Sequence, residues 1–314
     1  MINRRRAVLG TILLIISLPA FFALGEAVHF YLHNRANGSI VSSGQKREYE
    51  IYVPRSYDRT KATPLVISMH GAGGWAVQQM NMTRWNRLAD AERFIVVYPS
   101  GADGPGPRIW HVGREPELVN DVRFIAELID KLKASYNIDP ERIYANGFSN
   151  GGGMAFVLSC TLSDRIAAVG MVGAAQTLPW DWYTDPRPVP MISFHGTADP
   201  FAPYNGGISP IAPDALRFPD VAAWAAKWAA RNRCASTPIE SRFASGVTRR
   251  EYTGCADRST VMLFSVNGAG HQWFGGESFP EWFVGPASSG VDATSEMWAF
   301  FRAHPLRRIN ALAQ

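Results

Sequence analysis

The feature that most constrains this chain is the alternation of short apolar runs with helical patterns. The runs are rich in β-branched residues and bounded by turn residues, which is typical of buried strands. They predict an opening strand at residues 48–53 and buried strands at residues 64–69, 94–98, 143–145, 167–172, 191–194 and 261–266. Apolar stripes at helical spacing predict helices at residues 121–136 and 220–233. The alternation indicates an α/β fold with a mostly parallel central sheet and helices on both faces.

The N-terminus carries an export-type segment. Arg4, Arg5 and Arg6 precede an uncharged apolar run over residues 7–25, and this order is typical of a signal peptide. A helix of that length spans about 28 Å, close to the ~30 Å hydrocarbon core of a bilayer. We therefore expect residues 1–25 to be a signal peptide or an N-terminal membrane anchor. The body is then exported, secreted or periplasmic, or it is anchored by residues 7–25 outside the cytoplasm.

Charge and composition argue against a nucleic-acid partner. Hydrophobic content is 46 % and charged content 18 %, which is ordinary for a globular protein. The net charge of +4 largely comes from the three leader arginines, since the other basic residues nearly balance the 27 acidic ones. No basic run or basic helix face is present in the body. Membrane contact is expected only through an uncleaved N-terminal segment.

The three cysteines fall into two groups. Cys234 and Cys255 flank a β-like segment at residues 239–243 and 247–252, and we expect them to pair in an oxidising compartment. Cys160 lies in an apolar stretch and is expected to be a buried free thiol. The cysteine spacing does not fit a zinc site, so no metal is expected.

The sequence GFSNG at residues 147–151 is the strongest chemical motif. It follows the expected strand at residues 143–145 and precedes a helix-like stretch at residues 152–159, as a nucleophile elbow does. Its glycines let neighbouring chain approach closely, and the helix N-terminus offers N–H groups to an oxyanion. We predict Ser149 as the nucleophile and the Asn150 N–H as an oxyanion donor. The alternative is a glycine-rich turn that happens to hold a serine.

The sequence HGAGG at residues 70–74 directly follows another expected strand. A glycine-rich turn in this place can offer a second backbone N–H to the same oxyanion. We predict the Ala72 N–H, with Gly71 as the open alternative. A phosphate-binding loop would need Lys-Ser/Thr after its glycines, whereas Trp75-Ala76 follows here.

The general base follows from strand position and chain order. In a Ser–acid–His order only His271 and His304 follow Ser149 with room for an intervening acid. His271 comes just after the last expected strand, whereas His304 lies in a helix-ending stretch near the C-terminus. His195 ends the strand at residues 191–194, and a structural hydrogen bond near the site is expected for it.

The orienting acid is expected at Asp199, which closes the strand at residues 191–194. A carboxylate there can hold the imidazole of His271 in the required tautomer. Other acids fit by order alone but lie in proline-rich loops and are expected to be turn or cap residues: Asp181, Asp185, Asp214 and Asp220.

Several tryptophans are candidates for lining a substrate cleft: Trp75, Trp85, Trp110, Trp182, Trp273 and Trp282. At least half of them are expected to pack in the core or anchor loops. Trp273, which closely follows His271, and Trp110 are our predicted substrate-binding residues.

Four segments together resemble the extracellular poly(3-hydroxybutyrate) depolymerase-like esterases, which grade into feruloyl and acetylxylan esterases: PLVISMHGAGG, IDPERIYANGFSNGGGMA, FHGTADPFAPY and GAGHQWFGG. The likeness runs from about Gly44 to His304. It implies an α/β-hydrolase fold, a single catalytic domain at residues 38–308, and a serine triad of Ser149, Asp199 and His271. The family often has two acids at the start of the helix before the elbow, where this chain has Asn120-Asp121.

The resemblance also implies the chemistry. We expect a serine carboxylic-ester hydrolase that acts through an acyl-enzyme on a polyester or oligoester, without a metal or organic cofactor. Feruloyl or acetylxylan esterase activity, on hydroxycinnamoyl or acetyl esters, is the alternative. A serine peptidase, a thioesterase and an inactive binding protein on the same fold remain further alternatives.

Overall fold

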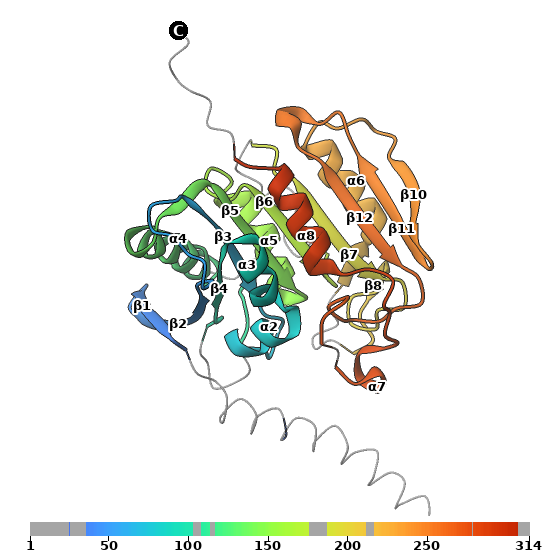
Figure 1. Ribbon diagram of the computed structural model, residues 1–314. Coiled ribbons are helices and arrows are strands. Elements are labelled where there is room, and N and C mark those ends of the chain that lie inside the picture. Colours follow the sequence, from blue (N-terminus) through green and yellow to red (C-terminus); the bar gives the residue numbers. More distant parts are fainter. Residues whose placement is uncertain are drawn as a thin grey trace, which may run out of the picture. The chain divides into compact units, whose positions relative to one another are not determined.

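A ten-stranded sheet runs through the centre of the fold (Figure 1). Its strands, in chain order, are β1 (Gly38–Ser42), β2 (Gln45–Tyr52), β3 (Thr63–Met69), β4 (Ile95–Pro99), β5 (Ile138–Phe148), β6 (Ala168–Val172), β7 (Met191–Gly196), β10 (Ile239–Ala244), β11 (Val247–Tyr252) and β12 (Val261–Val266). The spatial order is β1-β2-β4-β3-β5-β6-β7-β12-β11-β10. Pairing is parallel from β4 through to β12, and the strands outside this stretch pair antiparallel.

The computed structural model describes Gly25 and residues 36–102, 108–113, 117–175, 187–211, 217–277 and 279–306. Residues from Ala36 onward form one unit, and Met1–Arg35 form another. Apart from Gly25, the predicted signal peptide or anchor at residues 1–25 lies outside the described residues. Within the described ranges, no helix has the length and apolar character needed to cross a membrane.

Helices pack on both faces of the sheet (Figure 1). Buried side chains of α4 (Leu118–Ser135), α5 (Asn150–Thr161) and α6 (Val221–Arg231) share one apolar cluster. Those of α2 (Ala76–Thr83), α3 (Trp85–Glu92) and α8 (Ala293–Ala303) share a second cluster. The short helix α7 (Glu281–Val284) and the two-stranded sheet of β8 (Asn205–Ile208) and β9 (Arg217–Asp220) are smaller elements outside these layers.

The two-residue period of the strands divides the core between these layers. In β3, Leu65, Ile67 and Met69 belong to the α4–α5–α6 cluster, whereas Val66 packs in the α2–α3–α8 cluster. Successive side chains of a strand point to opposite faces, so a strand covered on both sides must be apolar throughout. All seven residues of β3 are accordingly buried.

The predicted α/β fold with a mostly parallel sheet is confirmed. Each apolar run predicted as a strand overlaps one, and β12 has the predicted bounds, residues 261–266. The runs at residues 48–53, 94–98 and 167–172 each extend one residue beyond the observed strand. Helices α2, α3 and α8 were not among the predicted elements. Helices α2 and α3 have eight residues each and are separated at Arg84, which has φ 58°, so neither displays a long apolar stripe.

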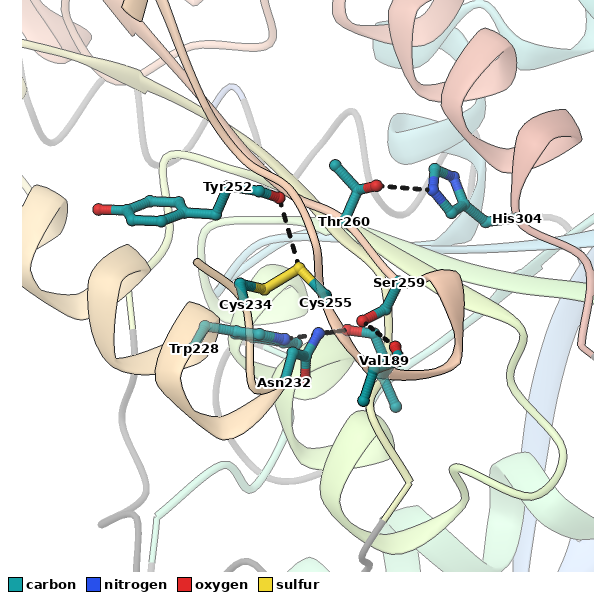
Figure 2. The surroundings of a disulfide bond; sticks show 10 residues. Val189, Trp228, Asn232, Cys234, Tyr252, Cys255, Ser259, Thr260 and His304 are labelled. Carbon is teal, nitrogen blue, oxygen red and sulfur yellow. Dashed lines mark hydrogen bonds between the residues drawn. A yellow bond between two sulfur atoms is a disulfide. The ribbon is translucent and has the colours of Figure 1, made fainter. Parts of the chain in front are cut away.

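The predicted pairing of Cys234 with Cys255 is confirmed (Figure 2). The bond joins the chain just after α6 to the chain just after β11, which lie 21 residues apart in sequence. The neighbouring Trp228 and Asn232 of the α6 end both donate to the Val189 carbonyl, at 3.0 and 2.8 Å. A closed loop of this size stabilises the fold by about 3 kcal/mol in the chain-entropy model. Cys160 is buried and forms no disulfide, as expected.

Candidate active site

The predicted site residues lie at the carboxyl ends of parallel strands. Ser149 directly follows β5, Asp199 follows β7, and His271 follows β12. His70 and its glycine-rich turn follow β3. Strands β3, β5, β6, β7 and β12 are consecutive neighbours in the sheet, so their ends meet along one edge. Open parallel sheets bind ligands at this edge.

Ser149 occupies a strained turn between β5 and α5. Its backbone has φ 52° and ψ −118°, and its N–H donates to the Val172 carbonyl at 2.8 Å. Such a conformation is uncommon for a residue with a side chain and persists only when its surroundings enforce it. A Cβ on Gly147 would lie 2.2 Å from the Gly151 carbonyl, and a Cβ on Gly151 would lie 2.2 Å from the Met69 carbonyl. Both glycines are therefore required for the sharp turn that exposes the serine.

Asp199 and His271 form a buried pair. His271 Nδ1 lies 2.7 Å from Asp199 Oδ2, and each residue is 5 % exposed. The other carboxylate oxygen accepts from the backbone N–H groups of Phe201 and Ala202, both at 2.8 Å. Burial alone would raise the pKa of Asp199, but the charge and hydrogen bond of His271 outweigh it and hold that pKa below its usual value. An ionised Asp199 accepts from Nδ1–H and leaves Nε2 of His271 as the available base.

The imidazole of His271 lies beside the serine turn. Its ring centroid is 4.7 Å from that of Phe148, the residue before Ser149. A Cβ on Gly173 would lie 2.9 Å from His271 Nδ1, and Gly173 follows the Val172 carbonyl that binds the Ser149 N–H. Within the described residues, no direct hydrogen bond joins the Ser149 hydroxyl to His271. Catalytic hydrogen bonds are often long before a substrate binds.

His195 has the structural role expected of it. It is fully buried, and Nε2 lies 2.8 Å from the Ala202 carbonyl and 3.5 Å from Asp199 Oδ2. Burial lowers the pKa of His195, which favours a neutral ring that donates from Nε2. His195 therefore holds the loop that carries Asp199, through its hydrogen bond to the Ala202 carbonyl. Among the rival acids, Asp220 caps α6 by accepting from the Ala223 N–H, and Asp181, Asp185 and Asp214 lie outside the described residues.

A neutral His70 shapes the turn after β3. The Gly101 N–H donates to His70 Nε2 at 2.9 Å, so Nδ1 carries the proton and donates to the Gly71 carbonyl at 2.7 Å. Burial lowers the pKa of His70 to about 4. A Cβ on Gly71 would lie 3.4 Å from Ser149 Cβ, and the next residue, Ala72, is exposed. The turn thus places Gly71 against Ser149, with the exposed Ala72 next in the chain.

The side chain of Asn150 fastens the start of α5 to the segment at residues 108–113. Its Oδ1 accepts from the Trp110 N–H at 2.7 Å, and its Nδ2 donates to the Trp110 carbonyl at 3.0 Å. The same segment reaches the His70 turn, because the Trp110 indole N–H donates to the His70 carbonyl at 3.1 Å. The Gly73 N–H donates to the Arg108 carbonyl at 2.8 Å. One short segment therefore connects the two places that we predict as oxyanion donors.

A buried ion pair holds this segment, a role that was not predicted for Asp121. Asp121 is fully buried; its Oδ1 lies 2.8 Å from Arg47, and its Oδ2 accepts from the His111 N–H at 2.8 Å. His111 Nδ1 lies 2.9 Å from the same oxygen. The burial of Asp121 could have been predicted from the sequence. Asp121 precedes Phe124 and Ile125 by three and four residues, so it shares their buried helix face.

The substrate-binding role predicted for Trp110 and Trp273 is corrected by their burial. Each is 1 % exposed and has its indole N–H bonded internally, Trp110 to the His70 carbonyl and Trp273 to Thr294 Oγ1 at 2.9 Å. Neither indole has a face open to a substrate. Trp75 and Trp85 are also buried, whereas Trp282 is 55 % exposed. Trp182 lies outside the described residues.

Across the described ranges, no group of three or more His, Cys, Asp or Glu side chains is placed to hold a metal ion.

The fold is that of the α/β hydrolases. Acetyl xylan esterase from Aspergillus awamori superposes with a TM-score of 0.60 at 15 % identity, and the match covers 84 % of this chain and 98 % of that one. At this identity the likeness concerns the fold alone.

Sequence relatives show which proteins the chain resembles. Residues 47–176 match the family model described as Esterase PHB depolymerase. Feruloyl esterase B of Piromyces equi is 31 % identical over 229 residues, 72 % of this chain and 42 % of that protein. A probable feruloyl esterase C of Aspergillus clavatus is 28 % identical over 277 residues, 85 % of this chain and 87 % of that protein. The resemblance to the depolymerase-like and feruloyl-esterase-like family is therefore confirmed.

Two relatives are much longer than the region that this chain matches. The chain spans 42 % of feruloyl esterase B and 23 % of a bifunctional acetylxylan esterase/xylanase of Neocallimastix patriciarum, to which it is 32 % identical over 168 residues. The family-model match contains Ser149 but ends before Asp199 and His271.

The two hydrogen bonds between the Asn150 side chain and the Trp110 backbone, which we call the Asn150 clamp, lead to a first prediction. Asn150→Ala leaves the backbone N–H in place but removes the two side-chain bonds to Trp110, so the predicted oxyanion donors lose one of the links that fix their spacing. We expect kcat for p-nitrophenyl butyrate to fall by about 10- to 100-fold, with KM changed by less than about threefold. Steady-state kinetics checks both values.

Asn37 provides a matched control for this variant. Its side chain makes the same pair of bonds to a backbone, accepting from the Ile51 N–H at 2.8 Å and donating to the Ile51 carbonyl at 2.9 Å, at the edge of the sheet. Asn37→Ala should leave kcat unchanged. Equal kcat values for Asn150→Ala and Asn37→Ala would contradict the positioning role.

The depressed pKa of His70 generates a second prediction. The unfolded chain binds a proton at His70 near pH 6.5, whereas the folded chain does so only near pH 4. Between these values the unfolded state holds more protons, so acidification favours unfolding. His70 should remove about 3 kcal/mol of stability between pH 6.5 and 4. The free energy of unfolding, measured with urea across this range, should fall less with acidification for His70→Gln than for the wild type. Identical declines would refute the lowered pKa of His70.

Proposed function

We propose that this protein hydrolyses carboxylic esters through an acyl-enzyme formed on Ser149. The observation that supports this most strongly is the buried Asp199–His271 pair, with 2.7 Å between Oδ2 and Nδ1, beside a strained serine turn. The names of the relatives, which are esterases, support the same chemistry. Residues 38–308 are the proposed catalytic domain.

In the proposed mechanism, Ser149 Oγ attacks the ester carbonyl carbon while His271 Nε2 accepts the hydroxyl proton. Asp199 keeps the Nδ1–H tautomer and stabilises the imidazolium that forms. The imidazolium then gives its proton to the leaving alcohol oxygen. A water molecule, deprotonated by the same histidine, attacks the acyl-enzyme and releases the acid.

The negative charge of the tetrahedral intermediate needs fixed donors. We assign them to the backbone N–H of Asn150, at the start of α5, and of Ala72, in the turn after β3. Gly71, which lies against Ser149, is the alternative to Ala72. Each such donor contributes about 2.7–4 kcal/mol to transition-state stabilisation.

The substrate is proposed within the ester class. Polyester or oligoester hydrolysis follows from the family description, Esterase PHB depolymerase. Feruloyl or acetylxylan ester hydrolysis follows from the names of the sequence relatives. The partner is then a hydroxyalkanoate, hydroxycinnamoyl or acetyl ester, with no nucleic acid involved.

Export is also proposed, on the basis of Arg4, Arg5 and Arg6 before the apolar residues 7–25. The Cys234–Cys255 bond is consistent with an oxidising compartment. We expect the protein recovered from outside the cytoplasm to lack about the first 25 residues. Mass spectrometry of its N-terminus checks this, since an intact N-terminus in a membrane fraction means an anchor, and an intact one in the cytoplasm contradicts export.

The nucleophile assignment gives the central prediction. In the full-length chain, Ser149→Ala should lower kcat/KM for p-nitrophenyl butyrate by about 10³-fold or more, because no acyl-enzyme can form. Ser39→Ala, an exposed serine on β1, is the control and should keep wild-type activity. Full activity in Ser149→Ala would refute the nucleophile.

Matched substrates separate the alternatives. Anilide and thioester analogues of the same acyl group are assayed beside the ester. The highest kcat/KM on the anilide would indicate a peptidase, on the thioester a thioesterase, and on the ester an esterase. A folded wild type that turns over none of them and is not labelled by a fluorophosphonate at Ser149 would be a binding protein.

A further inference from the structure

A row of aromatic rings extends from His271 to the protein surface. We call Phe201, Phe283 and Trp282 the aromatic strip. The ring centroids of Phe201 and His271 are 4.9 Å apart, those of Phe283 and Phe201 are 5.1 Å apart, and those of Trp282 and Phe283 are 5.8 Å apart. Exposure increases along the strip, to 37 % at Phe283 and 55 % at Trp282. An exposed row of large aromatic side chains that begins at a buried active-site imidazole is typical of a ligand surface.

The strip is held by the same backbone that holds the proposed base. The His271 N–H donates to the Val284 carbonyl at 2.6 Å, so α7, which carries Trp282 and Phe283, is bonded directly to the His271 loop. Val284 itself is 2 % exposed. The backbone N–H of Phe201 donates to Asp199 Oδ1. The rings are therefore fixed relative to His271, as a binding surface requires.

The acidic side chain of α7, that of Glu281, has a hydrogen-bond partner outside the aromatic strip. Glu281, next to Trp282 in sequence, accepts from the Ala287 N–H at 2.9 Å. The strip itself consists of three aromatic rings whose only polar group is the indole N–H of Trp282, so it matches a substrate group with an apolar face.

We propose that the aromatic strip binds the alcohol portion of the ester substrate. The inference rests on the proposed function. In that mechanism His271 gives its proton to the leaving alcohol oxygen, so the carbons attached to this oxygen lie beside the imidazole. Phe201 is in contact with that ring, and Phe283 and Trp282 continue outward from it. An alcohol portion with an apolar face, such as a sugar ring or the continuing chain of a polyester, then packs along the strip.

The test compares three esters by titration of the released acid: methyl acetate, cinnamyl acetate and methyl cinnamate. The second carries the bulky group on the alcohol side and the third carries it on the acyl side. In full-length protein bearing Trp282→Ala and Phe283→Ala together, kcat/KM for cinnamyl acetate should fall about tenfold or more. For methyl acetate and methyl cinnamate it should change less than about threefold.

Two further variants serve as controls. Trp282→Phe with Phe283→Tyr keeps the rings and should restore most of the activity on cinnamyl acetate. Phe243→Ala removes an aromatic ring of similar exposure, 38 %, from β10, where it packs against Phe264. This variant should leave all three substrates unaffected.

The outcomes separate this inference from the proposed function. A loss confined to methyl cinnamate, an equal loss on all three esters, or no loss on any of them overturns the alcohol-side assignment while leaving the esterase intact. If the wild-type protein hydrolyses neither these three esters nor p-nitrophenyl butyrate and Ser149 is not labelled by a fluorophosphonate, the proposed function is overturned, and the inference with it.

Discussion

The register of the parallel strands is the constraint on which the site depends. Across the sheet, Phe148 of β5 pairs with Val172 of β6, which pairs with Phe194 of β7, and Gly196 of β7 pairs with Val266 of β12. The strands thus end nearly in line. The short loops that follow need only a few residues to bring Ser149, Asp199 and His271 together. A slip of one residue in any pair would turn the side chains of that strand to the opposite face and displace its loop.

Around this edge, buried polar groups position the chain rather than take part in chemistry. His70 and His195 are neutral imidazoles that hold, respectively, the turn after β3 and the loop after β7. Asp121 and Arg47 form a buried ion pair that holds the segment at residues 108–113. Buried charges are costly unless paired, and removing one partner leaves the other unsatisfied. The site is therefore enclosed by interactions that tolerate few alternative arrangements.

The apolar runs predicted the central strands, because a strand covered on both faces has to be apolar throughout, as in β3 and β4. The GFSNG and HGAGG motifs and the position of His271 after the last central strand predicted a site that the fold does bring together. The tryptophans were misread for a physical reason. Closeness in sequence to His271 says nothing about orientation, and Trp273 turns inward to bond Thr294.

The sequence by itself determined the layer order and the strand ends that carry Ser149, Asp199 and His271, since local periodicity and glycine positions encode them. Only the tertiary structure decided which side chains surround them. The bonds of Asn150 to Trp110, the ion pair of Asp121 with Arg47 and the ring contact of Phe201 with Phe283 each join residues distant in the chain. Such contacts depend on how helices and loops pack over the sheet, and no local pattern records them.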